Sequence, residues 1–121
     1  MTTQELASRY QQLMTERKFL EIQDSFYSPD VVSQEMEKAT AMGMAVVTHG
    51  LEAVKGKGVA RRATIETMHS YHCSEPLVAG QFFSVVLRQE VTFKGRPRTS
   101  IEEIGIFEVK DGKIVKEQFF Y

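Results

Sequence analysis

The spacing of apolar residues predicts two helices at the front of the chain. Thr2 and Glu5 have the spacing of a capping box, which favours a helix start at that point. The expected first helix has an apolar stripe made by Leu6, Tyr10, Leu13 and Met14. The expected second helix has a stripe made by Phe19, Ile22 and Phe26. Pro29 should end this helix, because proline cannot continue it and restricts the preceding residue.

The middle of the chain is expected to hold two short strands and a third helix. Residues 31–35 are predicted as one strand, and residues 45–48 as a possible second. The helix is expected after Gly50, although Gly56 and Gly58 weaken it. Its apolar positions are Leu51, Val54, Ile65 and Met68.

The last fifty residues are typical of strands. Residues 70–79 and 81–93 have β-rich composition and are separated or bent near Gly80. A turn at residues 94–97 leads into the closing hairpin of residues 100–121, whose Asp111-Gly112 dipeptide is the strongest short-range hairpin pattern. We therefore expect a single α+β domain over residues 1–121, with about three helices in its first half and an antiparallel sheet.

Composition excludes several classes of function. The chain has 121 residues, 42% apolar content and a formal net charge of -1, so nothing favours general binding to nucleic acid or anionic membranes. Cys73 is the single cysteine, which excludes an internal disulfide. No apolar run is long enough to span a membrane and the first residues are not a signal peptide, so a cytoplasmic protein is expected.

Three segments carry a resemblance to a known family. They are FYSPDVV at residues 26–32, HGLEAV at residues 49–54 and DGKIV at residues 111–115. In this order they resemble the SnoaL-like branch of the nuclear-transport-factor-2-like superfamily, over essentially the whole chain. The resemblance implies a cone-shaped domain in which a curved sheet wraps against helices and leaves a pocket at its open end. It often implies a homodimer built through the sheet, but no single chemistry, since the superfamily includes isomerases, polyketide cyclases, dehydratases and binding modules. No cofactor is expected.

Ketosteroid isomerases of this superfamily suggest three catalytic candidates. Those enzymes use a carboxylate to move a proton beside a carbonyl, and a tyrosine with a protonated carboxylic acid to hold the resulting oxyanion. By resemblance, Tyr10, Glu35 and Glu103 occupy similar places in this chain. Both acids are glutamate, which differs from the isomerase pattern and reaches one methylene further.

Further residues are candidates for lining an apolar pocket. In the closing hairpin, Glu103 and Glu117 lie on partly apolar faces, where a carboxyl should have a raised pKa unless it meets a cation. Arg88, Arg96 and Arg98 are the cations considered as partners in an ion pair. The candidates for substrate binding are His72, Phe107, Glu117, Phe119 and Met44.

Simpler interpretations compete with several of these roles. Tyr10 can be a core residue, since it lies on the apolar stripe of its helix. His72 and Cys73 should point to opposite faces of a strand, so no metal site is expected there. The basic stretch from Lys55 to Arg62 lacks a phosphate-binding pattern and is interpreted as a solvated helix face.

Two functions from different classes remain. The first is a cofactor-independent isomerase, cyclase or lyase acting on a small apolar carbonyl compound, with Glu35 moving the proton. It requires Tyr10, Glu35 and Glu103 to converge on one cavity. The second is a non-catalytic module that binds a small ligand or dimerises, with its acids held in salt bridges.

Overall fold

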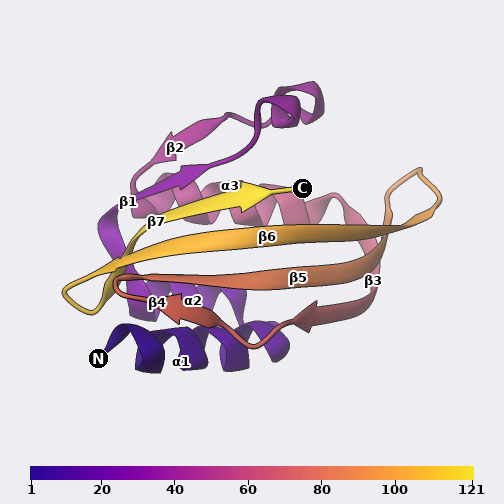
Figure 1. The fold of residues 1–121 in the computed structure, drawn as a ribbon. Coiled ribbons are helices and arrows are strands. Elements are labelled where there is room, and N and C mark those ends of the chain that lie inside the picture. Colours follow the sequence, from indigo (N-terminus) through magenta and orange to yellow (C-terminus); the bar gives the residue numbers. More distant parts are fainter.

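The computed structural model describes all residues, 1–121, and begins with two short helices (Figure 1). Helix α1 (Thr3–Thr15) starts at the expected capping box: the Glu5 amide donates to Thr2 Oγ1 at 3.1 Å, and the Thr2 amide donates to Glu5 Oε1 at 2.9 Å. Helix α2 (Phe19–Phe26) ends before Pro29, as predicted. The apolar stripe of α1 is buried, so this part of the sequence prediction is confirmed.

The remaining elements form one sheet and one further helix. They are β1 (Tyr27–Gln34), the short 3-10 helix η1 (Glu37–Met42), β2 (Val47–His49), α3 (Leu51–Ala63), β3 (Ile65–Cys73), β4 (Leu77–Ala79), β5 (Phe82–Phe93), β6 (Arg98–Lys110) and β7 (Lys113–Phe120). The strand order is β2-β1-β7-β6-β5-β3, with β4 paired to β5. Only the β1–β7 pair is parallel, which makes an otherwise antiparallel α+β sheet and confirms the predicted fold class.

The sheet is strongly curved and wraps around its helices. Strands β1 and β3 lie far apart in the strand order, yet α3 contacts both of them. Helix α1 packs below β3, β4 and β5 (Figure 1). Register shifts in β1 and β3 contribute to this bend, because a bulge increases the local twist of a strand. The curvature leaves the inner face of the sheet open to a cavity at one side of the helices.

One element prediction is wrong: the third helix stops at Ala63 and does not include Ile65 or Met68. Those residues belong to β3, where register shifts follow Ile65 and Met68. The shifts give the inward-facing residues Ile65, Met68 and Tyr71 a spacing of three, which resembles helical periodicity. A bulged strand therefore produced the apolar pattern that was interpreted as a helix.

The closing hairpin is confirmed. Asp111 and Gly112 have φ angles of 50° and 72°, so both central residues of the turn adopt the left-handed conformation that a type I′ turn requires. Gln118 pairs with Ile106 and Phe119 with Gly105 across this hairpin. Residues that alternate along β6 and β7 therefore point either into the concave side or out to solvent.

The core lies between α1 and the inner face of the sheet. The Tyr10 ring packs 4.6 Å from the Phe107 ring and 5.5 Å from the Phe83 ring, measured between centroids. Gly105 leaves room for two aromatic side chains, since a Cβ there would lie 2.9 Å from Phe107 and 3.3 Å from Phe119. No helix is long and apolar enough to cross a membrane.

Candidate active site

The concave side of the sheet holds a cavity of about 810 Å³. Its wall contains 30 residues, of which 16 are hydrophobic, and the polar remainder includes three glutamates. This volume and composition suit a small organic molecule held by apolar contacts and oriented by a few polar groups.

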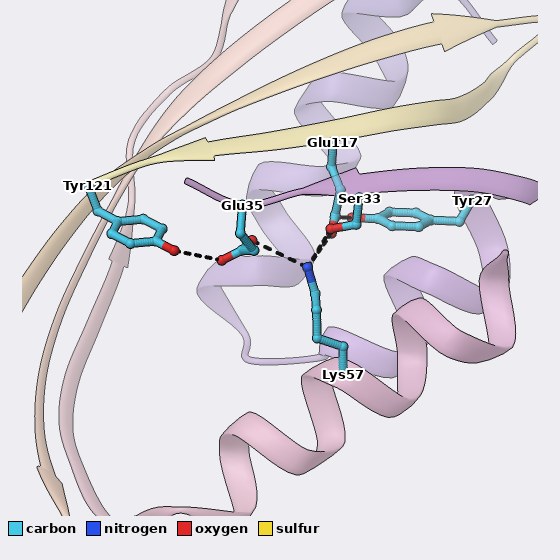
Figure 2. Close-up of polar contacts among 6 residues, drawn as sticks. All are labelled: Tyr27, Ser33, Glu35, Lys57, Glu117 and Tyr121. Atoms are coloured by element: carbon cyan, nitrogen blue, oxygen red, sulfur yellow. Dashed lines mark hydrogen bonds and ion pairs between the residues drawn. The ribbon is translucent and has the colours of Figure 1, made fainter. Parts of the chain in front are cut away.

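Glu117 of β7 is the most deeply buried acid in the cavity wall. It accepts hydrogen bonds from the Tyr27 hydroxyl and, at 2.6 Å, from Ser33 Oγ (Figure 2). Burial raises the pKa of Glu117, while these two hydrogen bonds and the charge of Lys57 act in the opposite direction. Both carboxyl oxygens of Glu117 are therefore held by contacts within the protein.

Lys57 extends from α3 into the space between two carboxylates, as Figure 2 shows. Its Nζ lies 3.3 Å from Glu35 Oε2 and 4.0 Å from Glu117 Oε2, and it donates to Ser33 Oγ. The Lys57 side chain is only 18% exposed. A single buried ammonium thus serves two acids, since burying either carboxylate without a cation would be costly.

Glu35 follows the last residue of β1, faces the cavity and keeps free hydrogen-bond acceptor positions. Its Oε1 accepts from the Tyr121 hydroxyl at 3.1 Å, and its Oε2 accepts from Lys57. A carboxylate offers about four acceptor sites, so two remain for a ligand. The ammonium group and the phenol fix the orientation of the Glu35 carboxyl in the cavity wall.

Glu103 of β6 differs from the other two acids because it makes neither a hydrogen bond nor an ion pair with the protein. Burial raises the pKa of Glu103 to about 7, with the Glu35 charge adding to the effect and Arg61 opposing it. The carboxyl is therefore neutral for a large part of the time at physiological pH. It can then donate a hydrogen bond to a ligand in the cavity.

The Tyr10 hydroxyl is a second donor without a partner in the protein. Its ring is buried, and the residue lines the cavity. Only one side-chain oxygen or nitrogen is both fully buried and without a hydrogen bond, and it is Gln23 Oε1. The Tyr10 hydroxyl also lacks a hydrogen bond, so it is not fully buried and is open to the cavity. Burial raises the pKa of Tyr10 well above its ordinary value, which keeps the phenol protonated. The Tyr10 ring is therefore part of the core, while its hydroxyl is available to a ligand in the cavity.

The structure brings six of the eight predicted site residues to the cavity. Tyr10, Glu35 and Glu103 all line it, as do Met44, Glu117 and Phe119. His72 does not, because Tyr71 is the β3 residue that faces inward and His72 is exposed on the other side. Phe107 is also misplaced by the prediction: it is fully buried beneath the cavity and not in its wall.

Four residues of this network were not predicted. They are Tyr27, Ser33, Lys57 and Tyr121. Lys57 was assigned to a solvated helix face, but it lies three residues after the buried Val54 and shares its stripe, which is the pattern that could have located it. None of the arginines considered as partners pairs with a cavity glutamate: Arg88 pairs with Glu102 at 3.5 Å, Arg98 pairs with Glu90 at 2.9 Å, and Arg96 forms no ion pair.

Together these groups can support proton transfer. A carboxylate held by lysine and two neutral donors face one largely apolar space. In such a space, fixed hydrogen-bond donors stabilise a developing oxyanion more strongly than they would in water.

Comparison with known proteins places the chain in a family. The SnoaL-like domain family matches residues 1–121. The chain belongs to the SnoaL-like family. A candidate SnoaL-like polyketide cyclase from Mesorhizobium loti is 30% identical, with a TM-score of 0.90 and full coverage of both chains. The resemblance seen in the sequence is thereby confirmed.

Other solved structures share the fold of this SnoaL-like chain at lower identity. TerC, crystallised with polyporic acid, is 18% identical with a TM-score of 0.80, and the match covers 98% of this chain and 90% of TerC. A protein with a ketosteroid isomerase-like fold from Catenulispora acidiphila, in complex with trimethylamine, is 17% identical. Its TM-score is 0.73, with 97% of this chain and 85% of that one covered. No curated protein matches the chain.

Proposed function

We propose that this SnoaL-like protein is a cofactor-independent isomerase or cyclase that enolises a small apolar carbonyl compound. The observation that carries the proposal is the unpaired Glu103 carboxyl, whose pKa is raised to about 7, in the same cavity as the lysine-held Glu35. A purely binding module would have no need to leave one carboxyl unpaired beside another that a lysine holds. A carboxyl with a raised pKa in a ligand cavity is typical of acid–base catalysis.

The proposed step moves one proton. Glu35 accepts it from the carbon next to the substrate carbonyl, and the electron pair of the broken C–H bond forms the enolate. The negative charge develops on the carbonyl oxygen, which accepts hydrogen bonds from Tyr10 and the neutral Glu103. Glu35 then returns the proton to another carbon, which gives isomerisation, or the enolate carbon attacks a second carbonyl, which gives cyclisation.

Deuterium uptake tests this step without knowledge of the natural substrate. Apolar aryl ketones, β-tetralone among them, would be incubated with the protein in D₂O and followed by NMR. We expect exchange of the α-hydrogen to be accelerated, and Glu35→Gln to reduce the acceleration about 10²-fold or more. The rate should fall as pH rises through about 7, because Glu103 then loses the proton that it donates.

Controls separate this mechanism from its competitors. Glu103→Gln keeps a donor, so it should retain part of the activity and lose the fall in rate near pH 7. A rate that rises through pH 7 would instead make Glu103 the base. The enolisation proposal is wrong if the folded protein does not accelerate α-hydrogen exchange of any ketone tested. It is also wrong if Glu35→Gln catalyses this exchange as fast as the unaltered protein.

We also propose that two copies pair through the outer face of the sheet. Apolar side chains are 38–50% exposed there, namely Phe82, Ile104, Ile106 and Phe120. Ile104 and Phe120 are cross-strand partners, so they form a continuous patch, and the Arg88–Glu102 pair beside it offers both charges to a symmetry-related copy. Light scattering should give a dimer, and Ile104→Glu should give a monomer; a monomer at micromolar concentration without substitution would contradict this assembly.

A further inference from the structure

The charge of the cavity wall contrasts with the charge of the whole chain. The chain has 15 basic and 16 acidic side chains, excluding histidine. The cavity wall, however, contains six lysines and arginines against three glutamates, one of which is partly neutral near pH 7. Positive charge is therefore concentrated on the surface that a ligand would meet.

Four of these cations form one group, which we call the arginine rim: Arg61, Arg62, Arg96 and Arg98. Arg61 and Arg62 belong to the last turn of α3, while Arg96 lies in the turn between β5 and β6 and Arg98 is the first residue of β6. The two segments meet where the Lys94 amide donates to the Thr64 carbonyl at 3.0 Å. The rim is thus a property of the tertiary fold.

The arginines of α3 lack acidic partners although they are half-buried. The Arg61 guanidinium lies over the Phe93 ring at 4.6 Å, and that of Arg62 lies over the Phe19 ring at 5.0 Å. Neither forms an ion pair, whereas Arg98 is paired with Glu90. Basic residues in a last helical turn complement the helix dipole, which accounts for their charge. The dipole does not account for their position in the wall of the cavity.

The rim begins near the acid–base groups and extends away from them. Arg61 follows Lys57 by four residues on α3, and its charge opposes the raised pKa of Glu103. Arg98 precedes Glu103 by five residues on β6, a separation of about 17 Å along the strand. Tyr121, beside Glu35, follows the end of β7 at the Glu103 end of the cavity. A ligand that reaches both regions is elongated and has two different ends.

From this arrangement we infer that the ligand of the cavity is an elongated apolar compound with a carboxylate at the arginine rim and a carbonyl at Tyr10 and Glu103. The apolar wall between the two regions, which includes Leu87 and Ile101, would hold the body of the molecule. Of the two ends of this ligand, only the carbonyl end rests on the proposed function. The carboxylate end rests on the rim itself.

A matched pair of probes tests the inference by calorimetry. 6-Acetyl-2-naphthoate has a ketone and a carboxylate at opposite ends of an apolar body, and its methyl ester lacks only the charge. We expect the acid to bind about tenfold more tightly than the ester, as a charge-assisted hydrogen bond provides, with a smaller ratio at high salt. Arg61→Gln and Arg62→Gln should each reduce this ratio.

Arg88→Gln is the matched control, because Arg88 is exposed on the outer face and pairs with Glu102. It should leave the ratio unchanged, and thermal melting would verify that each variant is folded. Equal binding of acid and ester, binding of neither at millimolar concentration, or a ratio insensitive to both rim variants would overturn the inference. Because binding needs no turnover, selective binding without deuterium exchange would contradict the enolisation proposal alone.

Discussion

Lys57→Met is expected to destabilise the protein by about 3 kcal/mol at neutral pH. The substitution leaves Glu35 and Glu117 without their shared cation, and these side chains are only 7% and 5% exposed. Removing one partner of a buried ion pair costs far more than the pair contributes, because the remaining charge is neither solvated nor paired. Chemical denaturation at pH 7 measures the loss directly.

The same helix provides the control for this prediction. Lys55 forms an ion pair with Asp24 at 2.6 Å, but Asp24 is 57% exposed. Lys55→Met should therefore cost no more than about 1 kcal/mol. In the Lys57→Met background, Glu117→Gln should recover part of the stability, since it removes one of the two buried carboxyls that lost their shared cation. Equal losses for Lys55→Met and Lys57→Met would show that Lys57 is not a buried counter-ion.

Glu103→Gln is expected to stabilise the protein at pH 8 by about 2 kcal/mol. The pKa of Glu103 is raised from 4.5 to about 7 in the folded state, so the folded protein binds more protons than the unfolded chain between these values. The contribution of Glu103 to stability is therefore fully present below pH 4.5 and is lost as pH rises through about 7. Glutamine does not titrate and avoids this loss, so Tm at pH 8 should rise by several degrees.

At pH 4.5 the same substitution should change Tm little, because Glu103 is protonated in the folded protein and glutamine is a close substitute. Glu102→Gln is the matched control on the adjacent residue. Glu102 points outward, is 69% exposed and pairs with Arg88. If Glu102→Gln raised Tm at pH 8 as much as Glu103→Gln does, the effect would come from net charge and not from the cavity.

Most of the fold could be predicted because its elements are specified locally. The capping box at Thr2, the stop before Pro29 and the Asp111-Gly112 turn each act within a few residues, and all three are confirmed. The boundary between α3 and β3 could not be predicted in the same way. The bulges of β3 depend on pairing with β5, which lies about twenty residues later in the chain.

The site was predictable only in part for a related reason. Glu35, Glu103 and Glu117 were identified as acids near a cavity, but their charge states depend on which distant residues meet them. Lys57 reaches Glu117 across 60 positions of sequence, a contact that no local pattern encodes. His72 was predicted to line the pocket, but it lies on the outer face of β3, and a shift of one residue along a strand reverses the face of every side chain.

The central claim is that the cavity holds a neutral carboxyl, free to donate to a ligand, at physiological pH. NMR titration of the glutamate side-chain carboxyl carbons measures this state directly, and Glu103→Gln assigns the resonance. The structure predicts a midpoint of about 7 for Glu103. A midpoint near the ordinary value of 4.5 would contradict the account, because Glu103 would then be an ionised acceptor throughout the physiological range.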